Sequence, residues 1–170
     1  MSKKLIVGTI ILLVITGIVA AIHLGNQESI ACMVIQVADQ KIDVSFEDLK
    51  QSSFSGELTD GKGDTKSHNY TGILLKDLLL KKGINLDHIS NVTVTSADNY
   101  SVIFTTEEVR DENRLYVAVT VDGNNIEGID PGMNGVQIII FGDPNSRRCV
   151  RFAQTITITK SLFILSNLYQ

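Results

Sequence analysis

One stretch near the C-terminal end constrains the fold of this 170-residue chain more than any other. Residues 135–141 are mostly apolar and run into the turn sequence Gly-Asp-Pro-Asn at 142–145, which a basic segment at 147–151 follows. Residues 155–158, Thr-Ile-Thr-Ile, alternate polar and apolar side chains, the pattern of a strand with one buried face. The stretch therefore predicts an apolar strand, a basic strand and a closing strand, which is typical of a sheet-rich domain.

The preceding part of the chain predicts more strands and one good helix. The expected strands are 33–37 and 41–44 as a hairpin, 91–95 and 101–104 joined by a turn at 98–100, and 115–121. Leucines at 74, 75, 78 and 79 form one apolar stripe, which predicts a helix from about 71 to 82 that ends at Gly83. The expected fold class is α+β, a strand-rich mixed α/β domain.

Two sequences with a capping-box pattern predict short helices. In each, a hydroxyl side chain and a carboxylate three residues later can satisfy free N–H groups: Ser45 with Asp48, and Thr105 with Glu108. Residues 51–68 are polar and predict the longest loop of the domain, a kind of segment that is often functional. The run Asp-Gly-Lys-Gly-Asp at 60–64 lacks the ligand alternation and the bidentate glutamate of a calcium loop, so we predict no metal site there.

The N-terminus predicts export of the domain. Residues 5–22 carry no charge and follow Lys3 and Lys4, so they are long enough to span a membrane with the lysines on the cytoplasmic side. The alternatives are a signal peptide cleaved near 19–21 and a lipoprotein modified at Cys32. We expect a cytoplasmic stub at 1–4, an anchor at 5–22, a tether at 23–32 and an extracytoplasmic domain at 33–170.

Charge argues against a nucleic-acid partner. Only Lys3 and Lys4 are charged among the first 25 residues, so the remainder carries 13 basic and 19 acidic side chains. Phosphate backbones are bound by basic surfaces, which this balance does not favour. Cys32 and Cys149 are the two cysteines of the chain, and they could pair in an exported domain or Cys149 could be a small buried hydrophobe.

Three segments carry a family resemblance. Residues 70–79 read Tyr-Thr-Gly-Ile-Leu-Leu-Lys-Asp-Leu-Leu, and 96–101 read Ser-Ala-Asp-Asn-Tyr-Ser. With 135–158, these segments resemble, in order and spacing, the oxidoreductase molybdopterin-binding domain, the fold of the sulfite oxidase family. The resemblance covers roughly residues 33–159 and implies that family's mixed fold.

The resemblance also implies a ligand that this chain lacks. Enzymes of that family hold molybdenum through a cysteine thiolate in the loop before the helix that residues 70–79 match. In this chain the matching loop is residues 54–68, which contain no cysteine. In the family, the turn matched by 142–148 contacts the cofactor's phosphate, which implies roles for Gly142, Ser146, Arg147 and Arg148. The alternative is a turn with two solvated arginines.

Two further residues are candidates for a pocket. Tyr100 could line it or could pack at the domain edge, and His68 could contact a ligand or could be a solvated loop residue. Two functions stay open: a binding module for a small anionic ligand or an envelope protein partner, with no cofactor, and a molybdopterin-dependent oxidoreductase with an atypical metal ligand or a partner redox subunit. The absent thiolate favours the first, and no catalytic residue is assigned.

Overall fold

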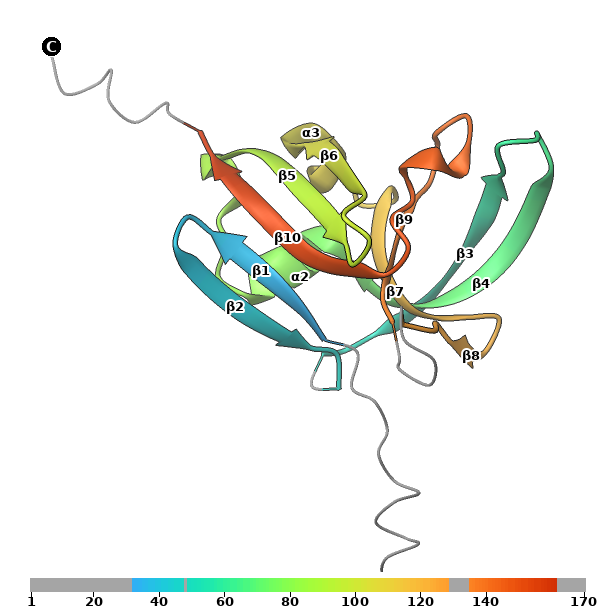
Figure 1. The fold of residues 1–170 in the computed structure, drawn as a ribbon, viewed down its shortest axis with the longest axis horizontal. Helices are drawn as coiled ribbons and strands as arrows, with labels where there is room; N and C mark the ends of the chain where they lie inside the picture. The colour runs from blue at the N-terminus through green and yellow to red at the C-terminus, as the bar shows by residue number, and fades with distance from the viewer. Residues whose placement is uncertain (1–31, 48, 129–134, 162–170) are drawn as a thin grey trace, which may run out of the picture.

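A computed structural model describes residues 32–47, 49–128 and 135–161 of the chain. The strands are β1 (Cys32–Val37), β2 (Gln40–Ser45), β3 (Ser52–Thr59), β4 (Thr65–Leu74), β5 (Ile89–Ser96), β6 (Ser101–Thr105), β7 (Leu115–Val121), β8 (Asn124–Asn125), β9 (Gln137–Ile140) and β10 (Ala153–Lys160). The helices are α2 (Leu75–Lys81) and α3 (Thr106–Arg110), with short 3-10 turns η1 (Leu86–His88) and η2 (Ser146–Arg148). The described domain is therefore a strand-rich α+β fold (Figure 1).

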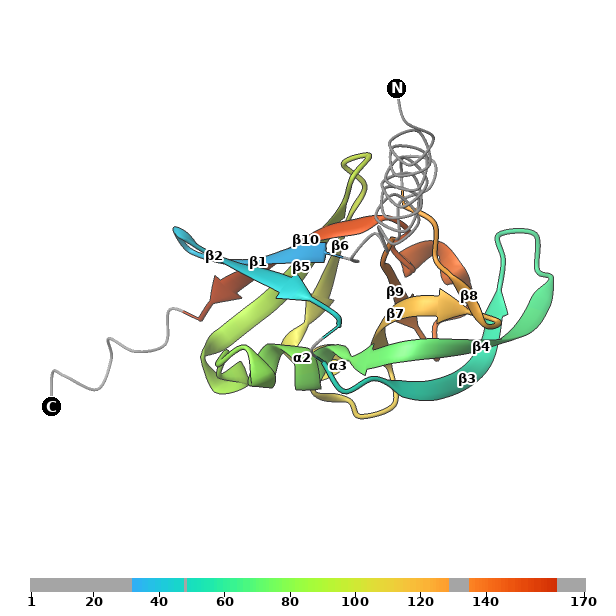
Figure 2. The ribbon, with the colours of Figure 1, turned by 90° about the horizontal axis from the view of Figure 1, so that it is seen from below.

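The strands form two five-stranded sheets. The first has the order β2-β1-β10-β5-β6, in which β1 and β10 are parallel and the other pairs are antiparallel. The second has the order β3-β4-β7-β8, and β9 also pairs with β7. Figure 2 shows that the β3–β4 hairpin extends beyond the rest of the second sheet as a curved arm.

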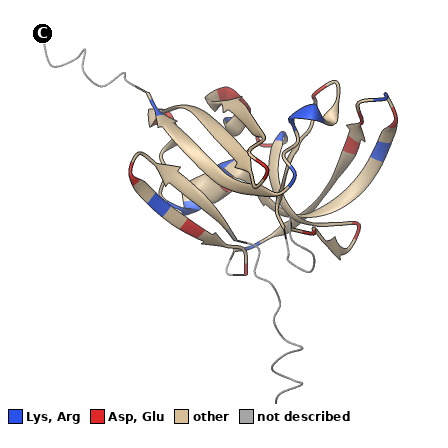
Figure 3. Ribbon diagram, in the orientation of Figure 1, with Lys and Arg blue, Asp and Glu red and all other residues tan. Residues whose placement is uncertain are grey.

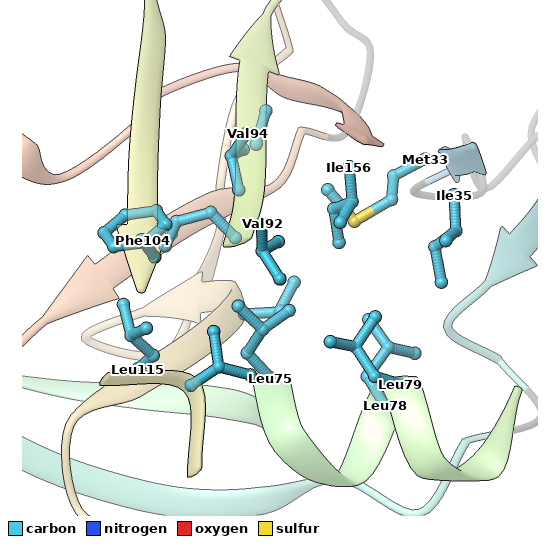
Figure 4. Packing of buried hydrophobic residues seen from close by; sticks show 14 of the residues in the cluster. Met33, Ile35, Leu75, Leu78, Leu79, Val92, Val94, Phe104, Leu115 and Ile156 are labelled. Atoms are coloured by element: carbon cyan, nitrogen blue, oxygen red, sulfur yellow. The ribbon is translucent and has the colours of Figure 1, made fainter. Parts of the chain in front are cut away.

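The main core lies between helix α2 and the first sheet. Leu75, Leu78 and Leu79 are fully buried, and their spacing places them on one face of the helix. They point toward Val92 and Ile156 of the overlying strands (Figure 4). Burial of these side chains, each worth about 2 kcal/mol, fixes the helix under the sheet.

A second, smaller cluster covers the other face of the second sheet. Tyr70, Ala118, Ile126 and Ile139 are its buried members. Half-buried aromatic rings surround them, and Phe54 stacks on Tyr116 with ring centroids 4.2 Å apart. The second sheet is thus apolar on both faces near β7, while its β3–β4 arm extends into solvent.

Several predicted elements are confirmed. The hairpin β1–β2, the strands β5 and β6, and the strand β7 lie where the alternation placed them. The turn between β5 and β6 has Asn99 in the left-handed region, with φ of 67°. Thr105 and Glu108 form both bonds of a capping box at the start of α3.

Other predictions were wrong. Residues 51–68 are not a loop but most of a hairpin, and α2 begins at Leu75 because Gly72 to Leu74 pair with β7 instead. No helix starts at Ser45 in the described residues around it, where β2 ends in a turn. The predicted basic strand is the 3-10 turn η2 followed by an isolated bridge at Val150.

The predictions for the N-terminal stub, the anchor at 5–22 and most of the tether fall on residues 1–31, outside the described residues. In the parts that are described, no helix is long and apolar enough to cross a membrane. Cys149 is a free, buried cysteine, and the side chain of Cys32 is not among those described.

Candidate functional site

A cleft of about 400 Å³ lies between the β3–β4 hairpin and the segment that runs from η2 into β10. We call it the hairpin cleft. Its lining residues are Leu58, Asp60, Asp64, Lys66, His68, Tyr70, Val121, Gln137, Ser146, Cys149 and Arg151. In Figure 1 the hairpin arm and the orange segment that contains η2 stand beside each other. The volume is in the range of sites for small organic molecules.

Strand β4 supplies one wall of the hairpin cleft. Side chains of a strand alternate between its faces, so Lys66, His68 and Tyr70 point to the same side. The register places Leu58 of β3 opposite Lys66, which adds an apolar surface beside the charged one. Tyr70 is buried at the inner end, and this burial raises the pKa of its phenol to about 12.

The opposite wall comes from η2 and the residues that follow it. The side chain of Asn145 accepts a hydrogen bond from the N–H of Arg147 at 3.1 Å, and the N–H of Cys149 donates to the carbonyl of Ser146 at 3.0 Å. These bonds close one tight turn. The turn presents Ser146 and Cys149 to the hairpin cleft, with Arg151 at its exposed end.

Lys66 and Arg151 give the cleft two cations. Both are exposed, and neither lies within ion-pair distance of a carboxylate among the residues that the structure describes. Asp60 and Asp64 also line the cleft, but the Asp60 carboxylate accepts the N–H groups of Lys62 and Asp64 at 2.8 and 3.0 Å. Those bonds are the main reason that the pKa of Asp60 lies below its usual value, and the nearby charge of Lys66 lowers it further, so this carboxylate stays ionised at the hairpin tip. Figure 3 shows basic residues on both the hairpin and the η2 segment.

His68 is held in place by Asp122. Its Nδ1 lies 2.7 Å from Oδ2 of Asp122, whose Oδ1 accepts the N–H of Asn69 at 2.9 Å. The bond from Asn69 and then the bond from His68 lower the pKa of Asp122, so the carboxylate stays ionised at neutral pH. The imidazole is thereby oriented, with Nε2 left for another partner.

The remaining predicted residues lie next to the cleft rather than in its lining. Arg148 is engaged by Glu108 and Asp143, and Arg114 contacts Asp143 at 2.8 Å. Asp143 is nearly buried, with 8% of its side chain exposed, so this group of charges is a fixed part of the fold. The role of Arg148 in binding an anion stays a prediction, because its guanidinium already has protein partners.

The η2 segment contains or adjoins three more of the predicted residues, Tyr100, Gly142 and Arg147. The hydroxyl of Tyr100 donates to the carbonyl of Arg147 at 2.6 Å, so this tyrosine ties the β5–β6 turn to η2. Gly142 has φ of 81°, a left-handed value that the turn after β9 requires. The side chain of Arg147 extends toward Gly61 at the hairpin tip.

The structure thus brings together His68 and Ser146, two predicted site residues that lie far apart in the sequence. It adds Lys66, Tyr70, Cys149 and Arg151 to the cleft, which the sequence analysis did not select. One signal for this set was available: polar and aromatic side chains at 66, 68 and 70 follow the period of a strand. The signal was missed because residues 51–68 were interpreted as a loop.

The donors in the hairpin cleft do not fit molybdenum as the family resemblance implies it. Cys149 is the one cysteine among the lining residues, and burial raises the pKa of its thiol. The resemblance places the metal-binding cysteine in the loop that residues 54–68 match, whereas Cys149 follows η2 on the opposite wall. Across the described ranges, no group of three or more His, Cys, Asp and Glu side chains could hold a metal ion.

Comparisons with known proteins give the fold and little more. No protein-family model matches the chain, and no curated protein matches it. Among solved structures, the sulfane dehydrogenase SoxCD from Paracoccus pantotrophus aligns with a TM-score of 0.60 and 14% sequence identity. The alignment covers 76% of this chain and only 38% of that one. The likeness therefore shows a fold related to that of an oxidoreductase, which partly supports the molybdopterin-binding type of fold that the resemblance implied.

Proposed function

We propose that this domain is a non-catalytic binding module, held outside the cytoplasm by its N-terminal segment, and that it binds a small anionic ligand in the hairpin cleft. The observation that carries the proposal is the pair of cations at the cleft, Lys66 and Arg151, neither of which forms an ion pair with a carboxylate among the described residues. Charged donors of this kind bind phosphate, sulfate or carboxylate groups.

The rest of the cleft lining supports a ligand with an apolar part as well. Leu58, Tyr70 and Val121 form a continuous apolar surface beside the cations. Ser146 and Gln137 add neutral hydrogen-bonding groups. A ligand with a flat ring and one acidic group would satisfy both parts of this surface, since pockets combine apolar walls with few polar contacts.

The alternative is a molybdopterin-dependent oxidoreductase with an atypical metal ligand. Cys149 is the observation that keeps this alternative open, because it lines the cleft of a domain whose fold an oxidoreductase shares. Its position after η2, outside residues 54–68 where the resemblance places the metal-binding cysteine, argues against it. The oxidoreductase could work with a partner redox subunit, and the binding module could have an envelope protein partner. In either case the binding module is expected to bind an anion.

The first experiment measures the cofactor content. The full chain is exported in a host that makes molybdopterin, purified in detergent, and assayed for molybdenum and for the fluorescence of oxidised pterin. Stoichiometric molybdenum would overturn the proposal in favour of the oxidoreductase. Pterin without metal would indicate that the domain is a cofactor carrier. The absence of both molybdenum and pterin would agree with the binding module.

The second experiment measures the anion site directly by calorimetric titration with phenyl phosphate and with inorganic phosphate. We expect Lys66→Gln and Arg151→Gln each to weaken binding about tenfold, the loss of one charge-assisted contact. Lys41→Gln, on β2 and outside the cleft lining, is the matched control and should bind as the natural protein does. Equal affinity in all four proteins would remove the anion site from the proposal.

A further inference from the structure

A second groove lies at the other end of the main core, and it shares no lining residue with the hairpin cleft. Its volume is about 410 Å³. We call it the end groove, and its lining residues are Val37, Gln40, Ile42, Lys82, Gly83, Ile84, Asn85, His88, Ile89, Ile158 and Lys160. They come from the β1–β2 hairpin, the end of β10, and the segment that links α2 through η1 to β5.

The floor of the end groove is apolar and incompletely covered. Ile84, Ile89 and Ile158 belong to the main core, with exposed fractions of 9%, 6% and 4%. Val37 and Ile42 pack against the same core but remain half-buried. Leaving apolar surface open to water costs about 25 cal/mol per Å², so a cover for this floor would be stabilising.

The chain itself arrives at the end groove. Strand β10 ends at Lys160, which is one of the lining residues, and the N–H of Ser161 donates to the carbonyl of His88 at 2.9 Å. Figure 1 and Figure 2 both show the end of β10 close to the β1–β2 turn. The described part of the chain therefore ends, at Ser161, beside the rim of the groove.

The residues that follow match the groove in chemistry. Residues 162–165 read Leu-Phe-Ile-Leu, and none of residues 162–170 carries a charged side chain. The rim offers Lys82, His88 and Lys160 and no carboxylate, so it would not attract a basic partner. A segment tethered at Ser161 also has a high effective concentration at this site, which a separate partner lacks.

We propose that the apolar run at 162–165 occupies the end groove of its own molecule and covers the open end of the main core. This occupant is favoured over a second copy or another protein because the connecting bond at His88 already directs the chain there. The inference is independent of the anion site, since the two clefts have no residue in common.

Photo-crosslinking of the full chain in detergent tests the proposal. The variant Phe163→p-benzoylphenylalanine is irradiated, and the crosslinked peptides are identified by mass spectrometry. We expect crosslinks within one molecule to residues 37–42 or 82–89. Crosslinks to those residues of a second molecule, crosslinks to detergent or to another surface, or the absence of any crosslink would each overturn the proposal.

A pair of variants shows whether the crosslink depends on the end groove. Ile42→Lys places a charge on the groove floor and should reduce the intramolecular crosslink at least about fivefold. Ile103→Lys changes an exposed isoleucine on β6, outside the groove, and should leave the crosslink unchanged. Deletion of residues 162–170 should lower the midpoint of thermal unfolding of the full chain and leave phenyl phosphate binding intact. An unchanged midpoint would contradict the proposal even where a crosslink forms.

Discussion

The guanidinium of Arg148 and the carboxylate of Glu108 meet at two points, with Nη1 to Oε1 at 2.7 Å and Nη2 to Oε2 at 3.0 Å. Nη2 also donates to the carbonyl of Ile103 at 3.1 Å, and the guanidinium lies 5.1 Å from the centre of the Phe104 ring. Paired donors of this geometry make strong, well-oriented bonds. Through these bonds Arg148 connects η2 to Glu108 of α3 and to Ile103 of β6.

The change Glu108→Gln should lower the free energy of unfolding by about 2 kcal/mol, the cost of losing hydrogen bonds between charged groups at a half-buried site. Glutamine still accepts the bond from the Thr105 N–H that completes the capping box, so the loss reports the bonds of Glu108 with Arg148 and, more weakly, with Arg114. Urea unfolding measures the change. Glu112→Gln, at an exposed pair with Lys76, is the control and should leave the free energy of unfolding nearly unchanged. Equal losses in the two variants would contradict the assigned role.

The same pair predicts a pH dependence. The bond from Arg148 is the main reason that the pKa of Glu108 lies below its usual value. A carboxylate with a lowered pKa stabilises the folded state above the unfolded pKa of about 4.3, and that contribution is lost as the pH falls below it. The difference in unfolding free energy between the natural protein and Glu108→Gln should therefore be full at pH 7 and shrink below about pH 4. A difference that stayed constant down to pH 3 would show that Glu108 does not act through its charge.

Elements set by short-range signals could be predicted from the sequence. The capping box at Thr105 and the alternation of 115–121 are such signals, and both predictions were confirmed. The hairpin β3–β4 was missed because polar residues dominate both strands, so the weak alternation at 54–58 and 66–70 was interpreted as part of a polar loop. The start of α2 was misplaced because pairing with β7, distant in sequence, holds Gly72 to Leu74 in a strand.

The candidate site depended on the same distant pairings. Lys66 and Arg151 line the same cleft only because the hairpin arm lies beside the η2 segment, and no local pattern in the sequence links them. The family resemblance implied a role for Arg148 in binding a phosphate, but no local pattern links Arg148 to Glu108, its partner in the structure. Charged residues in a motif are therefore weak evidence for a ligand until their protein partners are known.

Gly72 has a structural role in the segment 70–79. A Cβ at this position would overlap the carbonyl of Val117 and lie 2.9 Å from Cα of Ala118, because β4 and β7 approach closely at a bulge. Gly72→Ala should therefore cost about 3 kcal/mol of unfolding free energy in urea. Gly63→Ala is the control: it has open space but φ of 95°, and it should cost about 1 kcal/mol. The reverse order of the two losses would contradict the close approach of β4 and β7.

Tyr100 should act on the η2 turn through its hydroxyl. Tyr100→Phe removes the bond to the Arg147 carbonyl, which is worth about 1 kcal/mol. We expect faster hydrogen exchange at the N–H of Cys149, which closes the turn, and little change in anion affinity, because Tyr100 does not line the hairpin cleft. Tyr116→Phe, which loses a 3.3 Å bond at Glu112, should leave exchange at η2 unchanged. Faster exchange in both variants would show a general loosening instead.

Cys149 offers a direct test of whether the hairpin cleft could supply a thiolate. Burial raises the pKa of its thiol, so at pH 8 it should react with iodoacetamide at least about tenfold more slowly than an exposed cysteine, and its rate should keep rising above the pH at which the rate of the exposed cysteine levels off. The natural thiol is measured in a Cys32→Ser background by mass spectrometry. The exposed reference is Ser55→Cys on β3, made with Cys149→Ser in the same background. If Cys149 reacted as fast as the reference, burial would not protect its thiol, and the oxidoreductase alternative would gain support.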